Sequence, residues 1–329
     1  MNILFTSSGR RVSLIQKFKD VMSKNNIKGK IISADLKGNA PTAYISDKHY
    51  LVPKVTDKNY LQELLSICVL NEIDLVIPLI DTELNLIAKN KLVFNEHGIN
   101  VLVSSERINE IANDKLKTFE FFQRNSIPTP KVYSEQELEE KKFSFPLIVK
   151  PRNGSSSQGV TIINNEKELY FFKEYIPNAI VQEYIQGKEY TVDVMLDYEG
   201  NIKTIVPRLR IETRSGEVSK GTTKKDKRII NEVRKLLNVL PGSCGCITVQ
   251  LFKKEDGEIS IIEINPRFGG GIPLSIEAGA NFPLWTIEMS KGVIFNVEDF
   301  TWKDGFSMLR FDEALYMESN IYENKYTSV

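Results

Sequence analysis

The segment Glu263-Ile264-Asn265-Pro266-Arg267 combines side chains that suit phosphate chemistry at the end of an apolar strand. Because alternate residues of a strand point to the same face, Glu263 and Asn265 share one face and Arg267 follows on the same side. Carboxylate and amide oxygens suit Mg²⁺ ions that also bind substrate phosphates, and an arginine stabilises charge on a phosphoryl group in transfer. With Gln250 on the neighbouring strand, this pattern predicts a metal site made of Gln250, Glu263 and Asn265, with Arg267 as a catalytic residue.

Two lysines and a glycine-rich turn indicate a phosphate-binding site. Lys150 ends the apolar strand 146–150, and the turn Gly154–Gly159 separates it from a further strand at 160–163, so a hairpin lid is expected. Glycines let backbone amides approach an anion closely, serine hydroxyls add donors, and a lysine reaches a phosphate as a compact charge. The turn is not a P-loop, because no Gly-Lys-Ser/Thr follows at the required spacing. Lys115, at the start of a predicted helix, is the second lysine.

Each of these features has a simpler explanation when it is taken alone. An isolated lysine is usually a solvated surface residue, a Ser/Gly run is usually a flexible turn, and a polar strand end is often exposed. A carboxylate at the end of an apolar strand is costly to bury, however, and the features occur together. Cys244 and Cys246 could form half of a metal site, but no second cysteine pair exists, so they are interpreted as small packed residues.

Residues 1–103 alternate between strands and helices, which predicts parallel pairing and a doubly wound sheet. The expected strands are 3–5, 30–35, 75–79 and 100–103, and the expected helices are 12–21 and 61–69. Ligands of such sheets bind beyond the carboxyl ends of the strands. The segments Ser7–Arg11, Asp35 and Asp81–Glu83 should therefore lie along one edge.

The remaining residues predict two α+β units, at 104–187 and 188–329. The first contains a helix from 113, the two strands around the glycine-rich turn, a helix at 167–175 and a strand at 179–184. The second is rich in strands, expected at 190–195, 202–210, 246–252 and 259–264, with a helix at 226–240. Period-two alternation supports the strands, and the turn at Glu255–Gly257 should join the last two.

Composition limits the classes of protein that need consideration. The 329 residues carry 43 basic and 43 acidic side chains, which gives no broad footprint for nucleic acid or membrane. Three cysteines without a framework spacing favour reduced thiols, and the first residues enter a strand without the pattern of a signal peptide. No stretch reaches the roughly 18 to 20 apolar residues that cross a bilayer, so a cytoplasmic location is expected.

The order of lysine, lysine, glycine-rich turn and Glu-x-Asn-x-Arg resembles the ATP-grasp superfamily, most clearly from Asp114 to Gly271. The N-terminal turn Thr6–Arg11 is similar to that of stand-alone relatives of the carbamoyl-phosphate synthase large subunit. The resemblance implies a pre-ATP-grasp domain at 1–103, then an N-terminal subdomain at 104–187 with the lid and a C-terminal subdomain at 188–329 with the metal site. The two subdomains would hold ATP between antiparallel sheets.

The resemblance also implies a role for individual residues. The nucleotide-binding positions are Lys115, Lys150, Gly154, Ser155, Ser156, Ser157, Gly159, Gln182, Glu183, Tyr184, Ile185 and Glu189. Among them Glu183 and the backbone of 184–185 would read adenine, and Glu189 would hold the ribose. Gln250 stands where the family often has Asp or Glu, although Gln also occurs in the carbamoyl-phosphate synthase branch. Lys150, Arg267 and Arg210 are the expected catalytic residues; Arg214 fits an exposed basic strand equally well.

The resemblance implies an ATP-dependent carboxylate–amine or carboxylate–thiol ligase that forms an acyl phosphate, ADP and phosphate. It implies ATP and magnesium as cofactors, with manganese as an alternative, and small-molecule carboxylate and amine substrates in a homodimeric enzyme. Two alternatives stay open: a bicarbonate- or carbamate-activating enzyme of the same fold, and a non-catalytic ATP-binding regulator. A complete carbamoyl-phosphate synthase is not expected, because it needs two ATP-grasp halves. No sequence feature selects a particular acid or amine.

Overall fold

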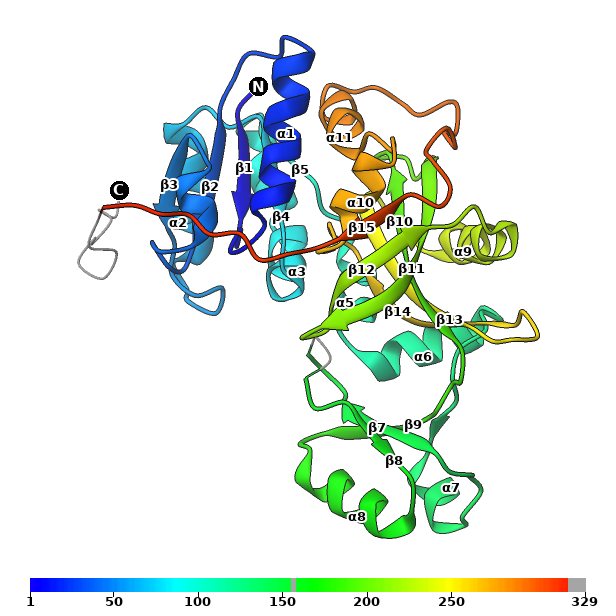
Figure 1. Cartoon of the computed structure of the whole chain (residues 1–329). Coiled ribbons are helices and arrows are strands. Elements are labelled where there is room, and N and C mark those ends of the chain that lie inside the picture. The colour runs from blue at the N-terminus through cyan, green and yellow to red at the C-terminus, as the bar shows by residue number, and fades with distance from the viewer. Residues whose placement is uncertain (155–157, 319–329) are drawn as a thin grey trace.

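The computed structural model describes residues 1–154 and 158–318. Three sheets organise these residues, with five, six and four strands (Figure 1). All strand pairs of the five-stranded sheet are parallel, whereas those of the other two sheets are antiparallel. The predicted fold class, a doubly wound parallel sheet followed by two α+β units, is therefore confirmed.

The five-stranded sheet has the strand order β3-β2-β1-β4-β5. Its elements are β1 (Ile3–Thr6), α1 (Val12–Lys24), β2 (Ile31–Asp35), the 3-10 helix η1 (Pro41–Tyr44), β3 (Lys48–Leu51), α2 (Tyr60–Leu70), β4 (Leu75–Pro78), α3 (Asp81–Lys89), α4 (Lys91–Glu96) and β5 (Asn100–Val101). Successive residues of a strand face opposite sides. Ile3 and Phe5 thus share a core with α1, while Leu4 packs in a second core with α2 and α3.

The four-stranded sheet, order β6-β9-β7-β8, forms the small unit at the bottom of Figure 1. Residues 104–187 contain α5 (Glu106–Ala112) and α6 (Lys115–Arg124), which lie outside this unit, and β6 (Val132–Tyr133), α7 (Glu135–Glu139), β7 (Leu147–Pro151), β8 (Thr161–Ile163), α8 (Glu166–Tyr175) and β9 (Ala179–Glu183), which form it. The helices α7 and α8 contribute Leu138 and Leu169 to the core of this unit. β7 and β8 pair antiparallel on either side of the glycine-rich turn, as the predicted hairpin requires.

The six-stranded sheet has the order β14-β13-β10-β11-β12-β15. Its region contains β10 (Lys188–Leu196), β11 (Ile202–Arg214), β12 (Glu217–Thr223), α9 (Lys227–Val239), β13 (Gly245–Lys253), β14 (Ile259–Asn265), α10 (Ile272–Glu277), α11 (Phe282–Ser290) and β15 (Ser307–Leu309). One face packs against α9 and also against α5 and α6, through Ile108, Phe122 and Leu236. The sequence division at 187 therefore differs from the packing at α5 and α6, and the three domain ranges remain a proposal.

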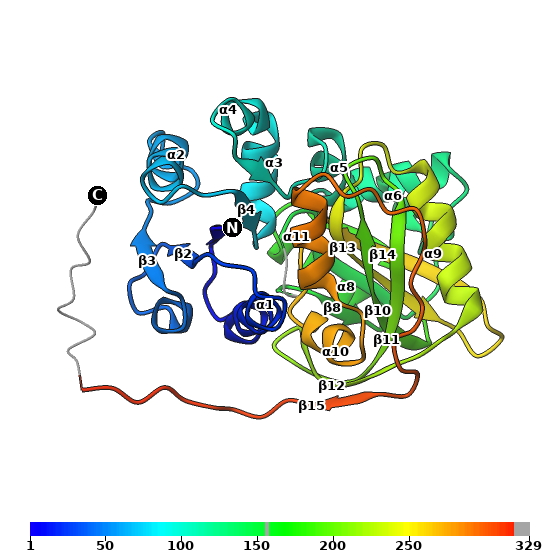
Figure 2. The same ribbon diagram turned by 90° about the horizontal axis from the view of Figure 1, so that it is seen from above.

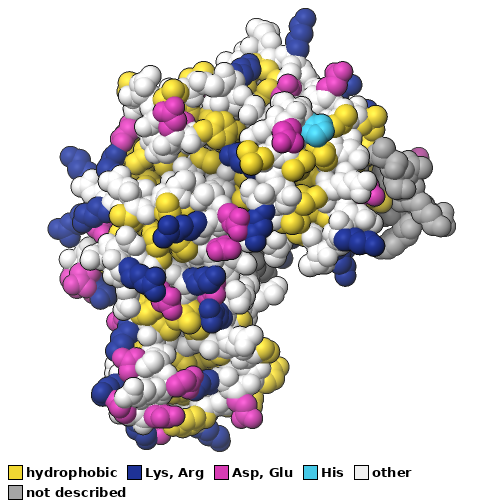
Figure 3. Space-filling model, turned by 180° about the vertical axis from the view of Figure 1, so that it is seen from behind, with side chains coloured by type: hydrophobic (Ala, Val, Ile, Leu, Met, Phe, Trp, Pro, Cys, Tyr) yellow, Lys and Arg dark blue, Asp and Glu magenta, His cyan; other side chains and the backbone are white. Residues whose placement is uncertain are grey.

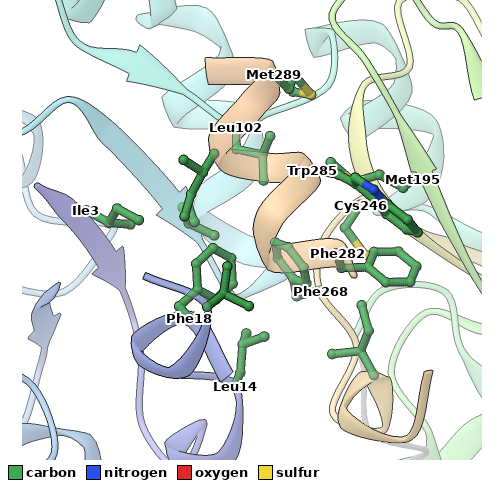
Figure 4. Close-up of a cluster of buried hydrophobic side chains, with 14 of the residues drawn as sticks. Ile3, Leu14, Phe18, Leu102, Met195, Cys246, Phe268, Phe282, Trp285 and Met289 are labelled. Carbon is green, nitrogen blue, oxygen red and sulfur yellow. The ribbon is translucent and has the colours of Figure 1, made fainter. Parts of the chain in front are cut away.

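The other face of the six-stranded sheet shares one hydrophobic core with the N-terminal domain. Phe18 of α1 meets Phe268 edge to face, with ring centroids 5.9 Å apart, and Phe282 and Trp285 of α11 lie in the same cluster (Figure 4). Figure 2 shows α1 beside α10 and α11 when the molecule is seen from above. This continuous core sets the carboxyl edge of the parallel sheet against the six-stranded sheet.

The predicted polar edge of the parallel sheet is present. The Ser7 hydroxyl donates to Glu83 over 2.8 Å, and the Gly9 amide donates to Asp35 over 2.8 Å. Asp81, at the start of α3, lies at the same edge and accepts two hydrogen bonds from Arg267. The edge therefore carries hydrogen-bonded polar groups, and Asp81 joins it to Arg267, which follows β14 in the chain.

Several elements were not predicted from the sequence. β12 reads Glu-Val-Ser-Lys-Gly-Thr-Thr, which has no apolar alternation, yet it pairs with β11 and β15 inside the six-stranded sheet. α11 reads Phe-Pro-Leu-Trp-Thr-Ile-Glu-Met-Ser, and because it is buried on most sides it shows little of the one-sided periodicity of a surface helix. β3, α3, α4 and α10 were also missed.

The surface and the cysteines agree with the composition. Figure 3 shows basic and acidic side chains interspersed over the face seen from behind. No helix in residues 1–154 and 158–318 is long and apolar enough to cross a membrane. The three cysteines are buried thiols, and no group of three His, Cys, Asp or Glu side chains among the described residues could hold a metal ion. Cys244 and Cys246 are therefore packed residues, as interpreted.

Candidate active site

A cavity lies between the four-stranded sheet and the six-stranded sheet. It is lined by Lys115, Pro130, Ile148, Lys150, Gly154, Gln158, Val160, Gln182, Glu183, Tyr184, Ile185, Glu189, Gln250, Phe252, Ile262 and Glu263. Ten of these residues belong to the predicted site. Residues from the helix α6, the lid hairpin, the hinge after β9 and the metal strands thus come together although they are up to 148 positions apart in the chain.

Lys150 is the most unusual charged group of the cavity. It lies one residue before the end of β7 and is buried, with 8% of the residue exposed, and its ammonium donates to the Gln182 amide oxygen over 2.6 Å. Burial lowers the pKa of Lys150 to about 8. No carboxylate among the described residues forms an ion pair with it; its hydrogen-bond partner is neutral, and the Glu263 charge only partly opposes the lowering of its pKa. An anionic ligand would supply the missing charge.

Lys115 approaches the cavity from the first turn of α6. Its ammonium donates to the Gly154 carbonyl over 2.8 Å, which ties the helix to the start of the lid. Asp114 caps this helix and also accepts a bidentate bond from Arg152, so the helix end and the lid strand are fixed together. Burial lowers the pKa of Lys115, and the Glu263 carboxylate opposes this shift. The two lysines and Glu263 therefore surround one end of the cavity.

The hinge after β9 forms another wall. The Gln182 side chain accepts from Lys150 and donates weakly to the Pro130 carbonyl over 3.3 Å. The backbone amide of Glu183 donates to the Lys131 carbonyl, and the Glu183 carboxylate accepts from the Lys131 amide over 3.1 Å. These bonds hold the end of β9 against residues 130–131. The predicted hinge residues Tyr184 and Ile185, which follow β9, line the cavity.

The strands β10, β13 and β14 carry the polar floor. Gln250 and Glu263 are direct partners across the β13–β14 pair, as predicted, and Thr191 pairs with Gln250 on the other side. Arg210 of β11 donates to Glu189 over 2.5 Å and to Gln250 over 3.3 Å. Burial raises the pKa of Glu189, and Arg210 counteracts that rise. Arg210 thus connects the predicted ribose residue to the predicted metal residues, but it does not line the cavity within the described part of the chain.

A bulge changes the face assignment of β14. The register between β13 and β14 shifts after Gln250, so Ile262 and Glu263 both line the cavity while Ile261 and Ile264 lie in the core. Ile262 is therefore only partly buried, because the inserted residue reverses the alternation at that point. Glu263 is half-buried, whereas Asn265 is buried.

Asn265 and Arg267 lie beyond the described lining of the cavity. Arg267 forms a bidentate pair with Asp81, with Nε–Oδ1 2.8 Å and Nη2–Oδ2 2.7 Å. A second bond from Nη2 reaches the Asn265 amide oxygen over 3.3 Å. The metal strand is thus joined to the edge of the N-terminal sheet. Gly159 also does not line the cavity, and Ser155, Ser156 and Ser157 fall outside the described residues.

Sequence reasoning missed the apolar part of the cavity. Its missed members are Pro130, Ile148, Val160, Phe252 and Ile262, together with Gln158 of the lid. The signal was present, since Ile148 stands two residues before Lys150 and Phe252 two residues after Gln250. Period two places these apolar residues on the same faces as the polar ones. An apolar end next to a cationic end suits a ligand with a flat ring and a phosphate chain.

Comparison with known protein families decides the classification. A model of the ATP-grasp domain matches residues 112–271, and a model of the PylC-like N-terminal domain matches residues 3–102. Together the two models match most of the chain. The chain belongs to the ATP-grasp superfamily. The family region contains the lysines, the hairpin, the hinge and the metal strands described above, which confirms the resemblance stated from the sequence.

Individual relatives match different shares of this ATP-grasp protein. A carbamoyl-phosphate synthase of Methanobrevibacter smithii is 24% identical over 78% of this chain and 72% of its own length. The carbamoyl phosphate synthase large chain of Clostridium beijerinckii is 32% identical over 50% of this chain, but the match spans only 17% of that large chain. The activity of the whole large chain therefore does not transfer to this protein.

The solved structures agree with the fold. The biotin carboxylase domain of 2-oxoglutarate carboxylase from Hydrogenobacter thermophilus superposes with a TM-score of 0.71 at 15% identity, over 93% of this chain and 73% of that one. That domain was solved as a dimer with MgADP, ADP and bicarbonate. At this identity the likeness establishes the ATP-grasp fold and no particular substrate.

The donor set of this ATP-grasp site fits a magnesium ion that is shared with phosphates. Glu263 supplies a carboxylate, and Gln250 and Asn265 supply amide oxygens, which are hard ligands of the kind that Mg²⁺ takes. The pairing of Gln250 with Glu263 across two strands brings two of these side chains to one place. Only one of these three side chains is charged, so phosphate oxygens and water would complete the coordination of a bound ion.

Proposed function

We propose that this ATP-grasp protein is an ATP- and magnesium-dependent ligase that joins a carboxylate to an amine, or to a thiol, through an acyl phosphate. The observation that carries the proposal is the buried ammonium of Lys150, which has no ion pair among the described residues and faces Glu263 and Gln250 across the cavity. A buried cation opposite a set of hard oxygen donors suits a metal-bound polyphosphate.

The cavity accounts for the two ends of ATP. The apolar side chains Ile148, Val160 and Phe252 would cover the adenine, and the hinge at 183–185 would offer its backbone to the ring edge. Glu189 would receive the ribose hydroxyls. Lys115, Lys150 and the amides of the lid would neutralise the phosphates, and Lys115 already contacts the lid at Gly154.

Magnesium would be held by Gln250, Glu263 and Asn265, and when bound it supplies charge neutralisation at the phosphates. In the proposed reaction an oxygen of the substrate carboxylate attacks the γ-phosphorus, which forms a carboxyl–phosphate bond and breaks the bond to ADP. The neutral amine then attacks the acyl carbon and displaces phosphate, while its proton passes to solvent or to phosphate. The protein contributes positioning and charge stabilisation, and the lid excludes water from the acyl phosphate.

Two alternatives have different consequences in an assay. An enzyme that activates bicarbonate or carbamate would use the same nucleotide site without an organic acid. A regulator without turnover would bind ATP but would not need the metal residues for its effect. The complete set of Lys115, Lys150, Glu263 and Arg267 favours an enzyme. A homodimer and the three domain ranges 1–103, 104–187 and 188–329 are proposed with this function.

The test is release of phosphate from MgATP, screened against pools of amino acids and other carboxylates with and without pools of amines. We expect release that depends on one acid and one amine, and a loss of at least about 100-fold in Glu263→Ala. Glu258→Ala is the matched control, because this exposed carboxylate lies at the same hairpin and pairs with Lys254 over 2.9 Å. Stimulation by bicarbonate alone would select the first alternative, and tight ATP binding without phosphate release in any pool would select the regulator.

A further inference from the structure

A cluster of arginines lies where three distant segments of the chain meet. Arg11 comes from the turn after β1, Glu217 begins β12, and Arg310 follows β15. Arg310 donates to the Glu217 carboxylate over 2.9 Å and to the Gly270 carbonyl over 2.7 Å. An ion pair of 3.6 Å joins Arg11 to the same Glu217 carboxylate. Two guanidinium groups therefore share one carboxylate.

The glycine run after the metal strand makes room for this cluster. A Cβ atom on Gly270 would lie 2.5 Å from Nη1 of Arg11 and 2.7 Å from Oε1 of Glu217, closer than real side chains approach. Only a residue without a side chain lets the loop touch both groups. The loop at 269–271 is thus shaped around the charged cluster, and it follows Arg267 directly in the chain.

The charges of the cluster do not cancel. Asp81 is engaged by Arg267, so Glu217 is the carboxylate that faces both Arg11 and Arg310. Burial, and then the positive charge of Arg267, lower the pKa of Arg11. Burial alone would raise the pKa of Glu217, but Arg11 and Arg310 hold it below its ordinary value, so Glu217 stays charged. Arg11 and Arg310 outnumber Glu217 by one positive charge, and Arg10 acts on Glu217 as well, so the cluster suits an anionic group.

The position of the cluster suits a substrate that meets the phosphate end of the nucleotide site. Gly270, which contacts the cluster, follows the end of β14 at Asn265 by five positions, so the cluster lies near the end of that strand. Residues 310–318, here called the C-terminal strap, run from β15 toward the N-terminal domain in both ribbon views (Figures 1 and 2). The side chains of Arg11, Glu217 and Arg310 remain 21%, 50% and 37% exposed, which leaves them accessible.

We propose that Arg11 and Arg310 bind a carboxylate of the substrate and that Glu217 takes its place when no substrate is bound. The inference rests on the proposed ligase function and assigns the acceptor side of the same site. The carboxylate belongs either to the acid that is activated or to an amino acid that serves as the amine. Either way, the C-terminal strap and the turn after β1 select the substrate together.

The experiment compares Arg11→Gln, Arg310→Gln and the control Arg214→Gln. Arg214 is a matched control because it forms an ion pair of 2.9 Å with Asp312 of the same strap, while both side chains are 77% exposed. The first readout is the half-saturating concentration of the acid and of the amine in MgATP-dependent phosphate release. We expect a rise of at least about tenfold for one of the two substrates in both cluster variants, and no change in the control. The substrate that responds identifies the source of the carboxylate.

The second readout separates this inference from the ligase function. Thermal shifts are measured without ATP against glycine, alanine, glutamate, succinate and acetate, and separately against MgADP. Stabilisation by a carboxylate that is lost in both cluster variants, with an unchanged MgADP shift, supports the inference even if no pool stimulates phosphate release. Failure of every carboxylate to stabilise the wild type, or equal stabilisation of wild type and variants, overturns it. Gly270→Ala is a further test that keeps both arginines. It should weaken the binding of the same carboxylate.

Discussion

Replacement of Lys150 by Met tests whether a buried cation is kept for an anionic ligand. Burial lowers the pKa of Lys150 from an ordinary value of 10.5 to about 8. That difference corresponds to about 3 kcal/mol at about 1.4 kcal/mol for each pKa unit. Met removes this cost, whereas loss of the hydrogen bond to Gln182 costs about 1 kcal/mol. We therefore expect the ligand-free variant to be about 2 kcal/mol more stable than the wild type at pH 7.

The pH dependence of this difference has a defined sign. In the unfolded chain Lys150 keeps its proton up to its ordinary pKa of 10.5, but in the folded chain it releases the proton above about pH 8. Between these values the unfolded state binds more protons, so the stability of the wild type rises with pH. The Met variant lacks this rise. Its advantage is therefore complete below pH 8 and disappears as the pH approaches 10.5.

Urea and thermal unfolding at pH 7, 8, 9 and 10, with and without MgADP, measure these effects. MgADP should raise the melting temperature of the wild type strongly and that of the variant weakly, because the phosphates lose their buried cation. Lys117→Met is the control, since Lys117 is exposed on the same helix as Lys115, and it should change neither quantity. A variant that is less stable than the wild type by the same amount at every pH would refute the reasoning, because Lys150 would then be a structural residue.

Two further predictions concern the walls of the site. Phe252→Ala removes part of the apolar wall and should weaken MgADP binding about tenfold by calorimetry, with the turnover rate changed only a few-fold; a larger loss of turnover than of affinity would contradict the placement of adenine there. Glu83 is fully buried and accepts from Tyr60 over 2.7 Å, from Ser7 over 2.8 Å and from the Leu79 amide over 2.9 Å. Glu83→Ala should therefore lower the free energy of unfolding by about 3 kcal/mol in urea, and a change below about 0.5 kcal/mol would show that water replaces these bonds.

The polar half of the site could be predicted because the types of its residues indicate their chemistry. Lys150, Glu263 and Asn265 lie at or near the ends of apolar strands. A polar residue is uncommon there and therefore indicates a functional site. The apolar half was not predictable in the same way, since Ile148 and Phe252 look like any core residue. Only the pairing of two sheets across a gap distinguishes a residue that lines a cavity from one that fills a core.

Bulges and long-range contacts limited the prediction further. The change of register between β13 and β14 after Gln250 places Ile262 in the wall of the cavity. No local sequence pattern predicts such a change. The pair between Asp81 and Arg267 joins residues 186 positions apart. The sequence placed Asp81 at a ligand-binding edge and Arg267 at a metal strand, but the contact depends on how the two sheets pack against one another.

The contacts of Arg267 join the N-terminal domain to the proposed reaction site. Both Nε and Nη2 of this arginine donate to Asp81, and Nη1 donates to the Phe268 carbonyl over 3.3 Å. An anionic group that reaches Arg267 must therefore compete with Asp81 or share the guanidinium with it. Asp81 begins α3, and the core shared by Phe18 and Phe268 fixes that domain against the six-stranded sheet. The orientation of the proposed catalytic arginine therefore depends on the N-terminal domain, and the proposed selection of substrate by Arg11 would depend on it too, although no residue of that domain lines the described cavity.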